Sequence, residues 1–139
     1  MLRKTVLACA AALASLAAPG LAAADVLASD PLFVGGASGP SFISCHVANA
    51  GTAAVALTAR LIGPSGQPIQ PLTTPFSCGA TLPAGEVCGI TGLVTGGFPY
   101  ACVVTTAGTG AFLRGTFQHN GAADDPGVTT PLLPTGATG

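Results

Sequence analysis

Apolar and polar residues alternate in short stretches along this chain, and glycine, proline and threonine separate one stretch from the next. In residues 42–48, for example, Ile43, Cys45 and Val47 share one face of an extended chain. Because successive side chains of a strand point to opposite faces, a period of two residues predicts a β-strand. Turn signals recur about every ten residues, a rhythm typical of an all-β sandwich or barrel.

This pattern predicts about seven strands and no helix. Proline cannot donate to a strand ladder, so Pro68, Pro71 and Pro75 make residues 67–76 an edge strand or an extended crossover. The predicted core faces include Leu57 on the third strand. Besides residues 67–76, strands are expected at 32–34, 42–48, 53–62 (the third strand), 87–94, 100–106 and 111–119.

The two ends of the chain differ from this pattern. Basic residues open the chain, residues 5–18 are almost wholly apolar, and Ala22-Ala23-Ala24 offers small residues before Asp25. We therefore predict a signal peptide at 1–24, too short to span a membrane. A β-sandwich domain is predicted at 25–119. Residues 120–139 form a low-complexity tail, and we expect it to be disordered because it has little apolar surface to bury.

Charge is scarce once the predicted signal is removed. Only Arg60 and Arg114 remain as strong bases, against five acidic residues, which gives a charge of −3. Binding to nucleic acid or to anionic lipid needs clustered lysine and arginine, so both kinds of partner are excluded. No membrane span is expected in the mature chain.

Four cysteines, Cys45, Cys78, Cys88 and Cys102, follow the predicted signal. An even number in an exported chain predicts two disulfides and a secreted or periplasmic location. Three pairings are possible, and spacing alone does not choose among them. No C-x-x-C is present, so neither a zinc ribbon nor a thioredoxin-like redox site is indicated.

The strand count resembles that of the immunoglobulin-like sandwich. Cys45 lies inward on an early strand, Cys102 lies inward on the penultimate one, and Tyr100 precedes Cys102 by two residues. In that fold, a disulfide joins these two strands across the core, and the tyrosine hydrogen-bonds to nearby backbone at a structural corner. The resemblance therefore implies Cys45–Cys102 and leaves Cys78–Cys88 as the second bond.

Three short segments are also similar to small exported bacterial proteins without assigned function. These segments are Cys45–Gly51, Leu82–Gly85 and Leu113–Gly115. This similarity implies export and names no chemistry.

The candidate metal ligands are His46 and His119, both expected on the strand face opposite the core residues. With Asp124 and Asp125 they would supply the nitrogen and carboxylate donors of a periplasmic copper-type sandwich. No H-x-H or H-x-x-x-H spacing supports this, and the mature chain has no methionine. We therefore expect surface histidines and no metal or other cofactor.

Catalytic constellations are missing from the sequence. Gly36-Ala37-Ser38-Gly39 lacks the spaced final glycine of a nucleophile elbow, and Glu86 has no second acid near it in sequence. The leading hypothesis is a non-enzymatic exported domain that binds a protein or an envelope component. Two alternatives remain: the metal-binding sandwich, and a structural subunit that assembles by adding strands to a neighbour.

Overall fold

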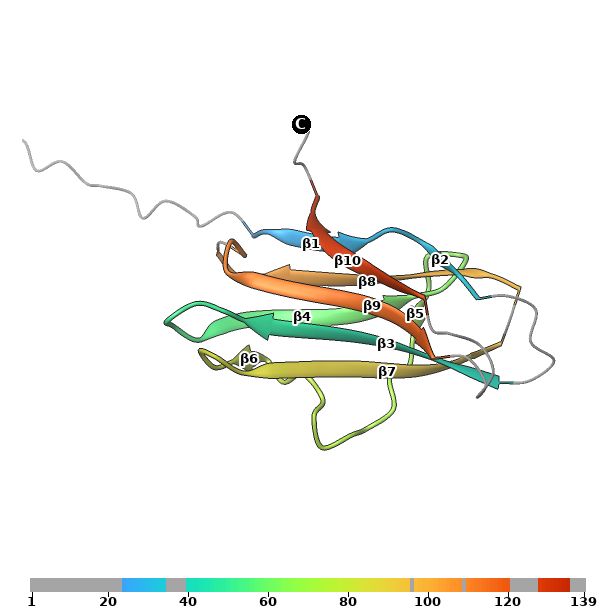
Figure 1. The fold of residues 1–139 in the computed structure, drawn as a ribbon, viewed down its shortest axis with the longest axis horizontal. Helices are drawn as coiled ribbons and strands as arrows, with labels where there is room; N and C mark the ends of the chain where they lie inside the picture. The colour runs from blue at the N-terminus through green and yellow to red at the C-terminus, as the bar shows by residue number, and fades with distance from the viewer. Residues whose placement is uncertain (1–23, 35–39, 96, 109, 121–127, 136–139) are drawn as a thin grey trace, which may run out of the picture.

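All the regular elements of the described chain are β-strands, and all of them pair antiparallel. The structure, a computed structural model, describes residues 24–34, 40–95, 97–108, 110–120 and 128–135 (Figure 1). The strands are β1 (Val26–Ser29), β2 (Leu32–Phe33), β3 (Pro40–Asn49), β4 (Val55–Ile62), β5 (Pro68–Ile69), β6 (Thr81–Leu82), β7 (Val87–Thr95), β8 (Pro99–Thr106), β9 (Leu113–Asn120) and β10 (Thr129–Pro134).

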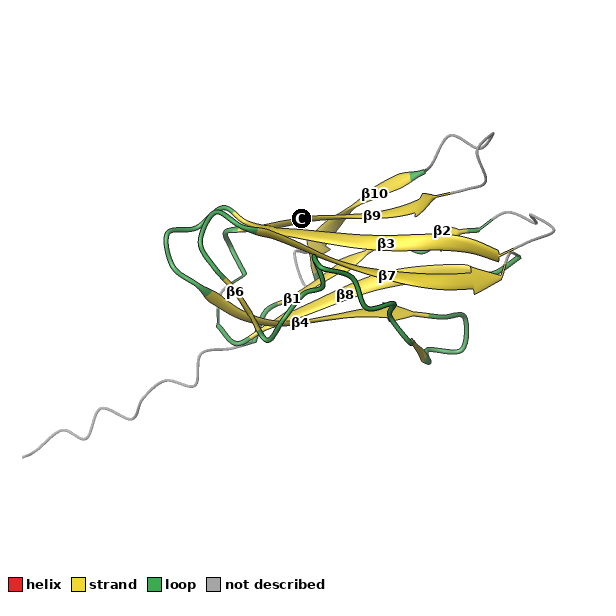
Figure 2. Cartoon of the chain, turned by 90° about the horizontal axis from the view of Figure 1, so that it is seen from below, coloured by secondary structure: helices red, strands yellow, loops and turns green. Residues whose placement is uncertain are grey.

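The strands form one sheet that curls into two layers. Its order is β5-β4-β8-β1-β10-β9-β3-β7, with β2 paired to β8 and β6 paired to β4. One layer contains β4, β8 and β1, and the facing layer contains β9, β3 and β7 (Figure 2). The strand β10 joins the layers on one side, because its first half pairs with β9 and its second half pairs with β1.

On the opposite side, residues 70–80 cross the gap between β4 and β7; we call them the bridging segment. The Leu72 amide donates to the Thr91 carbonyl at 2.7 Å, and the Gly89 amide donates to the Phe76 carbonyl at 2.8 Å. The chain then returns to β4 as β6. The sheet is therefore nearly closed and barrel-like.

Alternating side chains fill the space between the layers, as the sequence pattern predicts. On β3, Ile43, Cys45 and Val47 are buried, and on β8 Tyr100 and Cys102 are buried. Both strands thus have one face in the core, whose remaining members include Leu57, Leu61, Val104, Leu113 and Phe117.

Both disulfides implied by the resemblance are present. Cys45 on β3 and Cys102 on β8 are bonded with a Cα–Cα distance of 6.0 Å. Because β3 and β8 lie in different layers, this bond crosses the core. Cys78 and Cys88, with Cα atoms 4.8 Å apart, fasten the bridging segment to β7. Two disulfides fit a protein of an oxidising compartment.

The seven-strand sandwich prediction needs correction. In the described part of the chain, ten strands form a nearly closed sheet, and their connectivity differs from the immunoglobulin arrangement. In that arrangement the strand after the second cysteine pairs with the cysteine-bearing strand itself. Here β9 crosses to the other layer and pairs with β3, while β1 lies beside β8. Compared with the immunoglobulin arrangement, the first predicted strand (β2, beside β8) and the last predicted strand (β9, beside β3) lie in each other's layers.

The prediction of a disordered tail is wrong for Thr129–Pro134, which form β10. The reason is tertiary: Leu132 is buried, and its Cδ1 occupies the space that a Cβ on Gly115 would need. The rest of the tail beyond Asn120, except Val128 and Thr135, lies outside the described residues, as does nearly all of the predicted signal peptide.

Candidate functional site

The two histidines lie on opposite faces of one layer. His46 points outward from β3, as predicted, and is half-buried. His119 is only 3% exposed and lies on the inner face of β9, so its predicted orientation is wrong. The reason is strand periodicity, since His119 follows the core residue Phe117 by two positions.

His46 and His119 therefore cannot bind the same metal ion. Side chains on opposite faces of a sheet cannot reach a common ion at ligand distances of about 2.0–2.2 Å. Asp124 and Asp125 lie outside the described residues. Within the described ranges, no group of three histidine, cysteine, aspartate or glutamate side chains is placed to hold a metal ion.

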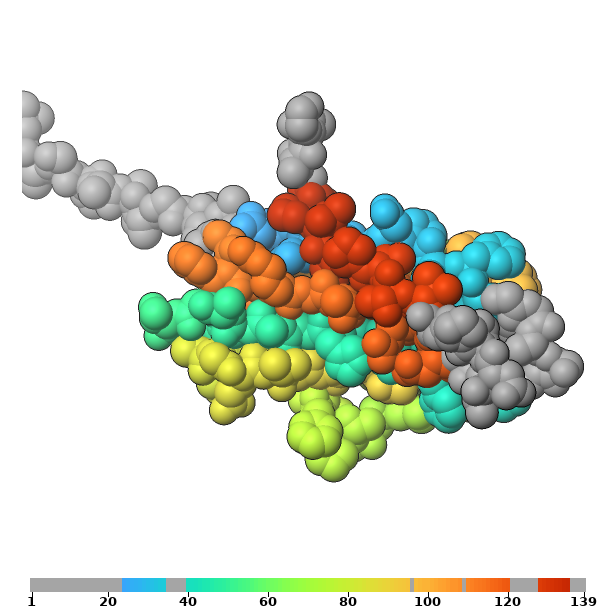
Figure 3. All heavy atoms as spheres, viewed as in Figure 1, coloured from blue at the N-terminus to red at the C-terminus, as the bar shows by residue number. Residues whose placement is uncertain are grey.

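The outward side chains of β7, β3 and β9 form a broad surface, which we call the outer face. Figure 3 shows these three strands next to one another, with the bridging segment along β7. Antiparallel register sets the side chains in rows across the strands. The rows are Leu93–Phe42–Asn120, Thr91–Ser44–Gln118, Gly89–His46–Thr116 and Val87–Ala48–Arg114.

Uncharged polar groups link the three strands within the outer face. The Ser44 and Thr91 hydroxyls are 3.0 Å apart, and Asn120 Nδ2 donates to Ser44 Oγ at 3.1 Å. Gln118 Nε2 in turn donates to Asn120 Oδ1 at 3.1 Å. These bonds hold several side chains in fixed positions, so this part of the face is an ordered hydrogen-bonding surface.

Exposed apolar side chains flank these polar groups. Phe42 and Leu93 lie at one end of the outer face, and Val87, 61% exposed, lies at the other. Phe76 of the bridging segment is 77% exposed and lines a hollow of about 440 Å³ together with His46 and Val87. Groups of exposed apolar side chains mark interaction surfaces more often than isolated apolar residues do.

The outer face carries little charge. Arg114 is the one charged residue among the outward positions named in its rows, and it stands at the end of the last row. Arg60 is exposed on β4, in the other layer, so the structure does not bring the two arginines together. Glu86 is exposed in the turn before β7, where its amide donates to the Pro83 carbonyl at 3.3 Å.

The tyrosine implied by the resemblance makes a backbone contact at the start of β8. Tyr100 is buried, and its hydroxyl donates to the Thr95 carbonyl at 2.7 Å. This bond ties β8 to the end of β7, in the facing layer, and fixes the corner between them. Its role is structural, since the hydroxyl points at backbone.

No helix in the described part of the chain is long and apolar enough to cross a membrane. Comparisons with protein-family models, with curated proteins and with solved structures each found no significant match.

Proposed function

We propose that this chain is an exported, non-enzymatic domain that binds a protein partner through the outer face. The observation that carries the proposal is the arrangement of that face: exposed Phe42, Leu93 and Val87 lie around ordered, uncharged hydrogen-bonding groups. Interfaces of this kind place apolar contacts beside satisfied polar groups and contain few charges at their centre.

The chemistry of the face defines its partner. A broad surface built from three strands favours a folded protein, which can contact the exposed apolar side chains at both of its ends, whereas small molecules favour pockets that bury most of their surface. With one arginine and no acid among its rows, the face complements an uncharged protein surface that presents apolar side chains. Binding should then depend little on salt, because screening weakens interactions between charges.

Two features support an immunoglobulin-like relationship as part of this proposal. They are the disulfide between β3 and β8 and the hydrogen bond from Tyr100 to the Thr95 backbone. In such folds the sandwich is a rigid scaffold, and the binding specificity belongs to its surface. The two disulfides also support export, which N-terminal sequencing of the mature protein would test by finding Asp25 first.

Assembly by strand addition receives less support from this geometry. Strand addition needs an open edge. The edge of β4 is partly occupied by β5 and β6, and that of β7 by the bridging segment. A protein partner on the outer face needs no open edge.

The test is affinity capture from the envelope fraction of the source cells, with variants that separate the outer face from other exposed apolar residues. Phe42→Ser with Leu93→Ser removes apolar side chains from the face. Phe33→Ser is the matched control, since Phe33 is exposed on β2, which pairs with the other layer. We expect the wild type and Phe33→Ser to retain the same protein, in low and high salt, and the double variant to lose it. Retention by the double variant would overturn the proposal.

A further inference from the structure

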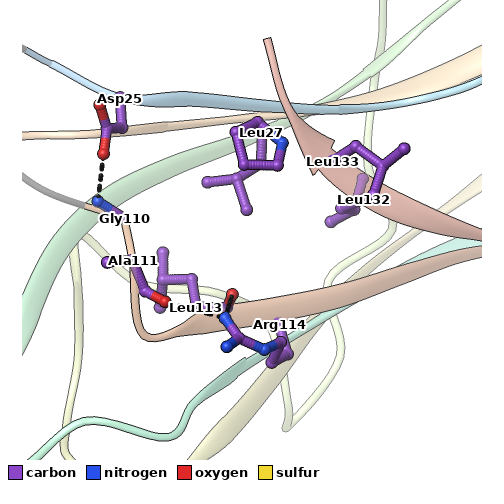
Figure 4. A pocket seen from close by; sticks show the side chains of 9 residues that line it. Asp25, Leu27, Gly110, Ala111, Leu113, Arg114, Leu132 and Leu133 are labelled. Atoms are coloured by element: carbon purple, nitrogen blue, oxygen red, sulfur yellow. Dashed lines mark hydrogen bonds between the residues drawn. The ribbon is translucent and has the colours of Figure 1, made fainter. Parts of the chain in front are cut away.

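A second hollow lies where β10 changes partners. Thr129–Pro131 pair with β9, and the last of these pairs is Pro131 with Thr116. From Leu132 onward, β10 pairs with β1 instead. Residues 113–115 of β9 therefore diverge from β10 and leave an opening of about 410 Å³ (Figure 4). We call this opening the seam hollow.

Most of the seam hollow is apolar. Leu27 of β1, Leu113 of β9 and Leu132 of β10 face it, as do Leu133 and Pro134. Its volume lies within the range of about 300–1,000 Å³ that is usual for ligand pockets. The hollow is also preformed, because β1 is paired to β8 and β9 to β3, and closing it would break those ladders.

A cation stands at one side of the seam hollow. Arg114 Nη1 donates to the carbonyls of Ala111 at 2.9 Å and Leu113 at 2.8 Å. These bonds use both hydrogens of Nη1 and hold the guanidinium at the rim. A guanidinium has five N–H donors, so three others are available for an anion. The planar arrangement of these donors matches a carboxylate.

An acid lies at another side of the seam hollow, so the two sides favour different ends of a ligand. Asp25 Oδ2 accepts a hydrogen bond from the Gly110 amide at 2.7 Å, which fixes the carboxylate at the wall (Figure 4). An anion beside the guanidinium of Arg114 would be attracted, and the carboxylate of Asp25 offers no such attraction. A single arginine opposite an acid also suits a monoanion better than a dianion.

We propose that the seam hollow binds a straight-chain carboxylate amphiphile of the fatty-acid class. The hydrocarbon tail lies against Leu27, Leu113 and Leu132, and the carboxylate lies at Arg114. This inference goes beyond protein binding through the outer face: the seam hollow shares Arg114 with the last row of that face, but its leucines lie outside the face.

Calorimetric titration of the disulfide-bonded protein with hexanoate, octanoate and decanoate, below their micelle concentrations, tests the tail. Burial of each methylene is worth about 0.8 kcal/mol, so the Kd should fall about fourfold per methylene until the hollow is full. An affinity that does not change along the series would refute the proposal.

The head group is tested with two arginine variants. Arg114→Gln should lower octanoate affinity at least about tenfold more than it lowers the affinity for 1-octanol, since it removes a charge-assisted hydrogen bond. Arg60→Gln, which removes the exposed arginine on β4, should leave octanoate affinity unchanged. Equal losses for acid and alcohol, or equal losses in the two variants, would show that Arg114 does not receive the carboxylate.

The location is tested by filling the hollow. Ala111 is exposed and lines it, so Ala111→Leu adds volume there without changing the buried core. We expect octanoate binding to be lost while the circular dichroism spectrum and melting temperature stay the same. The outer-face variant Phe42→Ser should bind octanoate as the wild type does. Normal binding by Ala111→Leu would mean that the site lies elsewhere and would overturn the inference.

Discussion

Replacing both Cys45 and Cys102 with alanine removes the covalent link between β3 and β8. The two cysteines are 57 residues apart in the sequence, so the bond strongly restricts the unfolded chain. The chain-entropy relation converts a loop of this length into about 4 kcal/mol of stability. Cys78 and Cys88 are 10 residues apart, and the same relation gives about 3 kcal/mol.

Urea unfolding at 25 °C, followed by far-ultraviolet circular dichroism, measures both differences. Domains of this size have a net stability of roughly 5–15 kcal/mol, so losing about 4 kcal/mol is a large change. The melting temperature should fall by about 15 °C. Both sulfur atoms of Cys45–Cys102 come from buried residues, so the alanine variant also leaves unfilled space, which adds to the loss.

The control is the variant with alanine at Cys78 and Cys88, which should lose less. An unchanged urea midpoint in the Cys45/Cys102 variant would refute the reasoning. So would a larger loss in the Cys78/Cys88 variant, because loop length would then not determine the effect. Mass mapping of the wild type must first show the native pairing.

Three substitutions test individual contacts. Tyr100→Phe removes the hydrogen bond to the Thr95 carbonyl and should cost about 0.5–1.5 kcal/mol in urea unfolding, because Thr95 is exposed and water can replace the lost donor; an unchanged midpoint would show that this bond does not stabilise the fold. Gly92→Ala places a Cβ 2.9 Å from Leu61 Cδ1 and should cost about 1–3 kcal/mol, whereas wild-type melting would show that the core adapts there. Leu132→Ala should cost about 2–5 kcal/mol if β10 is part of the core, and no loss would show that it is not.

Strands with one buried face were predictable from the sequence. The alternation around Cys45 and Cys102 places both cysteines inward, and the structure agrees. The same two-residue period also explains the error for His119: it lies two residues after the core residue Phe117 on β9, so its side chain points into the core. The outer face follows from the same alternation, because Phe42 and Val87 occupy the positions opposite to buried residues.

Features that depend on long-range pairing were not predictable. Residues 129–134 contain two prolines and little alternation, and they become a strand only because β1 and β9 offer edges to pair with. The short strand β1 was missed for a related reason, since it follows directly on the predicted signal. The seam hollow exists only because β10 changes partners, so no local pattern could indicate it.

The two disulfides are nested, since the Cys78–Cys88 loop lies wholly within the Cys45–Cys102 loop. During synthesis from the N-terminus, Cys45 and Cys78 emerge before their native partners. An oxidant acting on the emerging chain would join these two neighbours first and create a non-native bond. Correct bonding then requires either oxidation after the chain is complete or thiol exchange, which takes seconds to hours. Yield in a recombinant host should therefore depend on a disulfide isomerase.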